Sequence, residues 1–198
     1  MSAMIQTDIG LAEAIFHRRA VRSFSERQVD AGSVRSLLVA AVQAPSVLNQ
    51  QPWVFGVFHG RKRLQRISDR TKEFLVRTYP TTFELHSCSA LYERPDYDIF
   101  HGATTLIVIY ATRGRLNPNE DCCLAAENLM LAAYGMGMGT CPIGFARPWL
   151  DLFETKRELG VPEQYSAVFP VVVGYPTGVP LPMPREEPKV VSWKWDEE

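Results

Sequence analysis

Two short apolar runs, at residues 103–111 and 167–174, decide which architectures this chain can adopt. Both have the length of a buried β-strand, and neither approaches the length of a membrane-spanning helix. A third short run, residues 53–59 (WVFGVFH), is rich in β-forming side chains and predicts a further strand. Helical patterns precede and separate these strands, and this order of elements is typical of an α+β fold.

Periodic apolar residues predict the helices. Leu11, Ala14 and Ile15 lie on one face of a first helix that begins near Thr7 or Asp8. Further helices are predicted over residues 30–44, 61–78, 120–134 and 148–159. Leu124, Ala125 and Leu129 are expected to face inward in the fourth of these five helices.

Two segments show neither the helical nor the strand periodicity of apolar residues. Residues 79–100 show scattered aromatic side chains, and we interpret them as a surface excursion and a candidate lid. Five of the 14 prolines fall between positions 176 and 188, so the tail is predicted to run extended. Because solvated tails rarely carry two tryptophans, Trp193 and Trp195 are expected to bury against something, and a partner subunit is one candidate.

Pro170 indicates that the last strand is an edge strand or is irregular.

Composition narrows the classes of protein further. The 198 residues are enough for one domain, residues 1–198, and the formal net charge of −1 gives no reason to expect a nucleic-acid or membrane partner. The N-terminus lacks the pattern of a signal peptide. The four cysteines form no C-x-x-C pair, which indicates free thiols in a cytoplasmic protein. The four histidines are dispersed, so no metal site is expected.

Three arginines cluster at the end of the first predicted helix. Arg18, Arg19 and Arg22 lie within five residues, and Arg18 and Arg22 share a helical face. Guanidinium groups this close repel one another unless an anion sits among them, and arginine binds phosphate in a fork geometry. The alternative is that these cations only complement the dipole at the helix C-terminus.

A second stretch, residues 44–53 (APSVLNQQPW), places neutral polar side chains between two prolines. Ser46, Asn49 and Gln51 offer donors and acceptors without net charge, which suits a neutral heteroaromatic ring. No acid, base or thiol is present here, so hydrolysis is disfavoured. The alternative is a capped helix end followed by an Asx-type turn.

A third stretch, residues 135–145, is rich in glycine but fails as a dinucleotide fingerprint. The G-x-G-x-x-G spacing is not met, and the glycines follow a helix instead of a strand. The stretch is typical of a helix end, and Pro142, Ile143 and Gly144 could bring backbone close to a flat ligand. The sequence also lacks G-x-S-x-G and a phosphate-binding loop. The absence of an acid–base constellation favours a protein whose reactive atom belongs to a bound cofactor.

The three stretches, in this order, resemble the nitroreductase family of FMN-dependent oxidoreductases. R-R-x-V-R-x-F is followed about twenty residues later by A-P-S-x-x-N-x-Q-P-W, and Glu127-Asn128 with Pro142-Ile143-Gly144 resemble later family segments. The resemblance implies an α+β sandwich with a central mixed β-sheet flanked by helices. It also implies an intertwined homodimer with two FMN sites at the interface and with the tail, residues 176–198, reaching onto the partner.

The resemblance assigns roles by position. Arg18 and Arg19 would hold the phosphate and ribityl side of FMN, and Arg22 would lie beside the pyrimidine end of the ring. Backbone at Pro142, Ile143 and Gly144 would face flavin N5 and O4. The other subunit would contribute a loop that contains Pro45, Ser46, Val47, Asn49 and Gln51. Arg185 resembles a second phosphate ligand, with Lys189 as the alternative, and Ala20 stands where the family often has serine.

The implied activity is ping-pong hydride transfer from NADH or NADPH through FMN to a small-molecule nitroaromatic or quinone acceptor, with no catalytic protein side chain. Two alternatives share the fold: reductive dehalogenation or flavin fragmentation under a substrate-specific lid, and non-catalytic FMN binding or redox sensing. A further alternative is that the arginines bind a phosphate of a protein or nucleic acid.

Overall fold

The computed structural model describes residues 9–79 and 92–195, and it confirms the predicted α+β fold. The helices and strands in chain order are α1 Leu11–His17, α2 Ala31–Ala41, the 3-10 turn η1 Val47–Asn49, β1 Trp53–His59, α3 Arg61–Thr78, β2 Thr105–Thr112, α5 Pro118–Gly135, β3 Gly139–Pro142, the 3-10 turn η2 Gly144–Ala146, α6 Arg147–Leu150, α7 Phe153–Leu159 and β4 Tyr165–Gly174.

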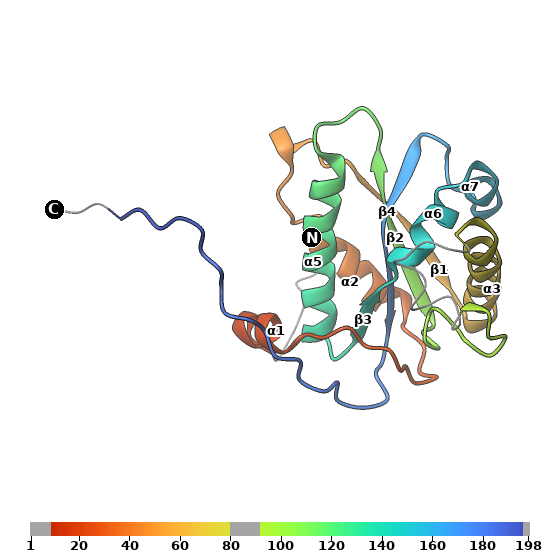
Figure 1. Cartoon of the computed structure of the whole chain (residues 1–198), viewed down its shortest axis with the longest axis horizontal. Helices are drawn as coiled ribbons and strands as arrows, with labels where there is room; N and C mark the ends of the chain where they lie inside the picture. The colour runs from red at the N-terminus through yellow and green to blue at the C-terminus, as the bar shows by residue number, and fades with distance from the viewer. Residues whose placement is uncertain (1–8, 80–91, 196–198) are drawn as a thin grey trace.

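The four strands form one sheet in the order β1-β2-β4-β3, and neighbouring strands are antiparallel (Figure 1). A parallel component comes from a single bridge between Ala20 and Thr140. The β2 and β4 strands lie at the centre, as their apolar sequences require, because both of their faces are covered.

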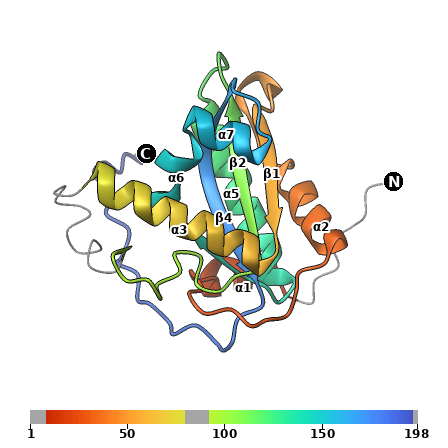
Figure 2. The same ribbon diagram turned by 90° about the vertical axis from the view of Figure 1, so that its right-hand side faces the viewer.

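Helices cover both faces of the sheet and give a sandwich with two apolar cores (Figures 1 and 2). On one face, α2 and α5 pack through Leu37, Ala125 and Leu129. On the other face, α3 and α6 pack through Leu64 and Trp149. The small side chains of α5 let this helix approach the sheet and α2 closely.

Several local expectations differ from the structure. The helix predicted over residues 148–159 is two helices, because Leu152 is extended and the Asp151 carboxylate accepts from the Ala167 N–H at 2.9 Å. Leu124 is exposed, since the buried face of α5 runs through Ala125 and Leu129 instead. The edge position expected from Pro170 is wrong, because β4 is an interior strand.

The interior position of Pro170 has a local explanation. Its carbonyl accepts from the Ile143 N–H at 2.9 Å, on the side where β3 has just ended at Pro142. The nitrogen of a strand residue faces the same side as its carbonyl, so the donor that proline lacks falls at the end of β3 and not on the β2 side. The irregularity expected from Pro170 does occur nearby, because the register between β2 and β4 shifts at Ile109 and Tyr110.

The second half of the segment that we expected to be a surface excursion is part of the core. Tyr92, Ile99 and Phe100 are buried against α3, while residues 80–91 of the candidate lid lie outside the described residues. The buried Lys72 fixes this segment, since its ammonium group donates to the carbonyls of Arg94, Pro95 and Tyr97 at 3.3, 3.4 and 2.7 Å.

Replacement of Lys72 by methionine should destabilise the fold by about 3 kcal/mol. The substitution keeps the chain volume but leaves three carbonyl groups without their charged donor. Urea denaturation should therefore show a lower midpoint, whereas Lys62→Met, on the exposed side of the same helix, should leave the midpoint unchanged. Equal midpoints for the two variants would refute this role of Lys72.

Two parts of the chain expose apolar side chains instead of burying them. In α1 only Ala14 is buried, and Leu11, Ile15 and Phe16 are exposed. The end of the tail extends away from the body of the protomer, with Trp193 and Trp195 at 73% and 78% exposure (Figure 1). No helix in the described part of the chain combines the length and apolar character needed to cross a membrane.

Candidate functional site

The segment that carries the N-terminal arginines lies along the β3 edge of the sheet. Ala20 bridges to Thr140, and the Val21 N–H donates to the Thr140 carbonyl at 2.9 Å. Gly139 makes this approach possible, because a Cβ atom on it would lie 2.6 Å from Cγ2 of Val21. The glycine-rich stretch after α5 therefore forms a strand, β3, against which the arginine segment packs.

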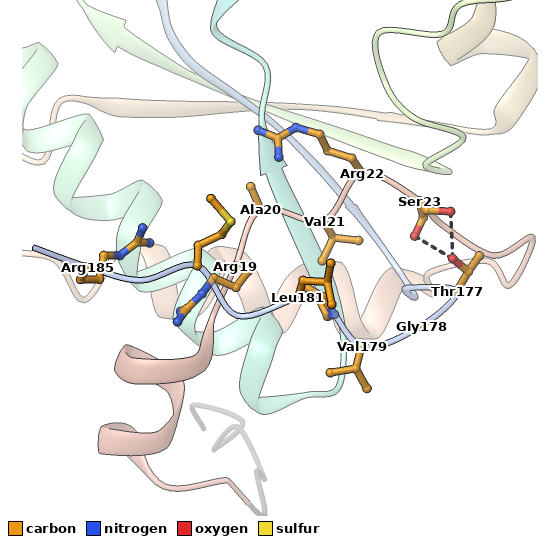
Figure 3. A pocket seen from close by; sticks show the side chains of 12 residues that line it. Arg19, Ala20, Val21, Arg22, Ser23, Thr177, Gly178, Val179, Leu181 and Arg185 are labelled. Carbon is orange, nitrogen blue, oxygen red and sulfur yellow. Dashed lines mark hydrogen bonds between the residues drawn. The ribbon is translucent and has the colours of Figure 1, made fainter.

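The start of the tail returns to the same place. Phe24 bridges to Pro176, and the Thr177 hydroxyl lies 2.8 Å from the Ser23 hydroxyl. Between the arginine segment and the tail lies a cavity of about 620 Å³ (Figure 3). It is lined by Arg19, Ala20, Val21, Arg22, Ser23, Thr177, Gly178, Val179, Pro180, Leu181, Met183 and Arg185. The cavity thus unites residues more than 150 positions apart in the sequence.

The cavity is positively charged and its cations are incompletely paired. Arg19 donates from Nη1 to the carbonyls of Phe16 and Arg18, both at 2.8 Å, but its buried Nε has no partner within the described chain. Arg22 and Arg185 make no hydrogen bond or ion pair with any residue that the structure describes. Such a set of donors suits an anionic ligand.

Arg18 faces an adjoining cavity of about 350 Å³, which it shares with Arg19 and Thr140. Its Nε donates to the Glu127 carboxylate of α5 at 3.2 Å, and the side chain is largely shielded from solvent. Arg18 is therefore already oriented by an ion pair. The family resemblance includes Glu127 but predicts no role for it, because the pair joins residues 109 positions apart.

The polar loop between α2 and β1 is held in an uncommon conformation. Leu48, Asn49 and Gln51 have positive φ angles of 51°, 54° and 45°, which non-glycine residues rarely adopt. The loop is fixed by the buried carboxylate of Asp121, which accepts from the Val47 N–H at 3.3 Å.

Within the loop, the Ser46 hydroxyl accepts from the Gln51 N–H at 2.9 Å, and Gln51 donates to the Asn49 side chain at 3.0 Å. Pro45, Ser46, Val47, Asn49 and Gln51 line neither of the two cavities just described. Within one protomer the loop is therefore separate from the arginine cavity.

Pro142 is the last residue of β3, and Ile143 and Gly144 follow it. Pro142 and Gly144 are exposed, and the Ile143 side chain is buried in the core. The same strand that binds the arginine segment thus presents an accessible backbone turn.

The buried thiols of the protein are held in their protonated form. Burial raises the pKa of the Cys141 thiol, which keeps that group protonated, and burial raises the pKa of Cys122 to about 12. Within residues 9–79 and 92–195, no three histidine, cysteine or acidic side chains gather where they could hold a metal ion. Lys189 pairs with Glu186 at 2.7 Å and does not line the cavity, so of the two alternative tail cations only Arg185 does.

The antiparallel sandwich and its arginine-lined cavity define an α+β protein suited to a phosphorylated ligand. Residues 15–175 match the Nitroreductase family, and the chain belongs to this family. A protein of Archaeoglobus fulgidus, named as an NADH dehydrogenase or NAD(P)H nitroreductase, is 30% identical over 164 residues, which cover 82% of this chain and 83% of that protein.

Two further similarities add detail. A 4-nitrobenzoate reductase of Nocardioides is 28% identical over 193 residues, with 80% of this chain and 77% of that protein covered. The crystal structure of a nitroreductase with bound FMN from Bacteroides fragilis has a TM-score of 0.78 and 25% sequence identity. That comparison covers 94% of this chain and 98% of the other.

Proposed function

We propose that this protein is an FMN-dependent NAD(P)H oxidoreductase that reduces nitroaromatic or quinone-type small molecules. The observation that carries the proposal is the cavity that Arg19, Arg22 and Arg185 line with incompletely paired guanidinium groups. Family membership and the similarity to a nitroreductase with bound FMN support the choice of cofactor.

The residues of the cavity fit a phosphorylated mononucleotide. The orphaned Nε of Arg19 and the unpaired Arg185 supply charged donors for a phosphate, and Arg18 lies beside them in the adjoining cavity. Ala20 removes one hydroxyl contact that a serine would offer, so the phosphate and ribityl side would depend more on the guanidinium groups. The volume of about 620 Å³ lies in the range usual for cofactor sites.

Bound FMN would supply the hydride-accepting and hydride-donating chemistry. The protein would contribute position and charge: Arg22 would place a cation beside the pyrimidine end of the ring, where reduction develops negative charge. The backbone of Ile143 and Gly144 would lie near the reactive edge of the ring. No protein side chain needs to be catalytic in this arrangement.

A homodimer would complete the site. Leu11, Ile15 and Phe16 of α1 expose apolar surface that a soluble monomer does not usually leave uncovered. Leu48 is 81% exposed at the tip of a loop whose strained backbone is fixed by Asp121. We propose that this loop, residues 45–51, enters the flavin site of the second copy, which explains why it is rigid and yet remote from its own arginine cavity.

The location that we propose is the cytoplasm. Cys122 and Cys141 are buried free thiols, which agrees with a reducing compartment.

The electron acceptor is a small molecule, and the similarity to 4-nitrobenzoate reductase supports an aromatic nitro compound as one class of acceptor.

Anaerobic stopped-flow mixing tests the proposed reaction. With FMN-loaded protein, NADH or NADPH should bleach the visible flavin absorbance. After the nicotinamide nucleotide has been removed, addition of a quinone or nitroaromatic should restore that absorbance. If FMN binds but neither nucleotide bleaches it, the protein binds the cofactor without catalysing this reaction, and the proposed reaction would be wrong.

A further inference from the structure

Arg18 is the one arginine of the N-terminal cluster that has a charged partner within the described part of the chain. Its Nε donates to the Glu127 carboxylate at 3.2 Å. Among the described residues, Arg19 bonds only to backbone carbonyls at the end of α1, and Arg22 forms no bond or ion pair. The proposed function uses Arg18 as a charged group beside the phosphate of FMN and gives Glu127 no role.

The guanidinium group of Arg18 is bonded on one side only. A guanidinium group holds its N–H donors in a rigid plane, with Nε at the side and the two Nη groups at the end. The Nη groups of Arg18 bond to no residue that the structure describes, and the side chain lines the cavity of about 350 Å³ beside the arginine cavity. The bond at Nε therefore leaves the end of the group available for a phosphate.

The packing of α1 does not fix the direction of the Arg18 side chain. Arg18 is the C-cap of a seven-residue helix in which only Ala14 is buried. A long side chain on such a helix loses rotamer freedom when it binds a ligand, and this loss weakens binding. An anchor outside α1 would restrict the side chain before the ligand arrives.

Helix α5 supplies such an anchor, because its inner face is fixed in the core. Ala125, Ala126 and Leu129 are fully buried in the cluster that joins α5 to the sheet and α2. Glu127 lies on the outer side of the same helix. Fully exposed ion pairs contribute little, but here the Arg18 side chain is only 22% exposed, against 45% for Glu127, so the restraint acts on a largely shielded arginine.

We propose that Glu127 is a positioning residue for the cofactor: it holds Arg18 through Nε so that the Nη groups bind the phosphate of FMN. Glu127 thereby sets the preference of the protein for FMN over riboflavin. This inference rests on the proposed function and adds to it a residue that does not touch the cofactor. Riboflavin has the ring and the ribityl chain of FMN but lacks the phosphate, so the pair acts on FMN alone.

The negative charge of Glu127 opposes its effect on position. A carboxylate beside the site lowers the positive potential that attracts a phosphate monoester, whose charge is about −1.5 to −2 at pH 7. Removal of the carboxylate therefore weakens FMN binding if position dominates and strengthens it if charge dominates. We expect position to dominate, because Arg19, Arg22 and Arg185 line the neighbouring cavity and attract the anion in either case.

Titration of the apoproteins with FMN and with riboflavin, followed by flavin fluorescence, tests the proposal. Glu127→Ala should raise the FMN dissociation constant about tenfold, because Arg18 loses its acceptor, and should change the riboflavin constant by less than about twofold. Glu127→Gln keeps an oxygen that can accept from Nε and removes the charge. This variant should bind FMN at least as tightly as the wild-type protein.

Two further comparisons separate positioning from a general effect of charge or of folding. Glu120→Ala removes the same charge from α5, but Glu120 is exposed and lines neither cavity, so the FMN constant should not change. In a chain that already carries Arg18→Ala, Glu127→Ala should not weaken FMN binding further. Alanine is the strongest helix former, so α5 should stay intact, and thermal unfolding of each apoprotein checks this.

An FMN constant in Glu127→Ala that equals or falls below the wild-type value would overturn the proposal. Equal losses in the alanine and glutamine variants, or a parallel loss of riboflavin affinity, would also overturn it, because charge or the fold would then explain the effect. Failure of the proposed function has a separate signature: the wild-type protein itself binds no FMN, or NAD(P)H does not bleach its bound flavin.

Discussion

Replacement of Arg185 by alanine is expected to weaken FMN binding about 10- to 100-fold. Arg185 lines the cavity together with Arg19, and it has no partner among the described residues that would hold it elsewhere. A hydrogen bond to a charged group contributes about 1.5–3 kcal/mol, and each 1.4 kcal/mol corresponds to about tenfold in affinity. Titration of the apoprotein with FMN, followed by quenching of flavin fluorescence, measures the change.

Lys189→Ala is the matched control for this experiment. Lys189 is a tail cation of the same sign four residues away, but it pairs with Glu186 and lies outside the cavity. Its removal should change the FMN dissociation constant by less than about twofold, in line with the small contribution of exposed ion pairs. If Lys189→Ala has the larger effect, the assignment of the phosphate ligand is reversed.

Replacement of Gly139 by valine should lower both the stability of the fold and the affinity for FMN. A Cβ atom at this position would lie 2.6 Å from Cγ2 and 2.9 Å from Cβ of Val21, so the arginine segment must move away from β3. Overpacking of this kind costs about 1–3 kcal/mol, which should lower Tm by several degrees. Because Ala20 and Arg22 flank Val21, the displacement should also remove most FMN binding.

A double-mutant cycle separates this clash from a general effect of the glycine. Gly139→Ala should be destabilising alone, and Val21→Ala in the same chain should recover part of the loss, because it removes the Cγ atoms at 2.6 and 3.1 Å and leaves only the Cβ atom at 2.9 Å. Gly10→Ala is the control, since nothing lies within 4 Å of a Cβ atom there. If Val21→Ala gives no recovery, contact between these two residues does not place the arginine segment.

Local patterns predicted most of the regular structure. The short, β-rich residues 53–59 form β1, and the periodic residues 61–78 form α3, with the predicted bounds. Asp30 caps α2 through a bond to the Ser33 N–H at 2.9 Å, as a helix start near that residue requires. These elements are determined by neighbours within a few residues in the sequence.

The misjudged features depend on distant parts of the chain. The four-residue strand β3 has no periodicity of its own and exists because it pairs with β4 and the arginine segment. Pro170 is tolerated inside the sheet only because β3 ends opposite it. The segment at residues 94–97 is held by Lys72, a cation inside an otherwise amphipathic helix. None of these contacts leaves a local pattern.

In the candidate site, too, some features depend on neighbours in the sequence and others on contacts between distant residues. Sequence proximity grouped Arg18, Arg19 and Arg22, but the return of Thr177 and Arg185 to that cluster is a tertiary feature. The role of Glu127 as the partner of Arg18 is likewise a contact between remote residues. The loop at residues 45–51 remains a proposed contribution to a second copy, because its place in the flavin site depends on an interface between protomers.

The visible absorption spectrum of the purified protein, taken before and after NADH or NADPH, tests the central claim that the arginine cavity binds FMN for hydride transfer. The account predicts a yellow protein, or one that turns yellow with added FMN, whose flavin bands bleach on reduction and whose bound flavin after purification is lower in Arg185→Ala. A colourless protein that does not take up FMN would contradict it.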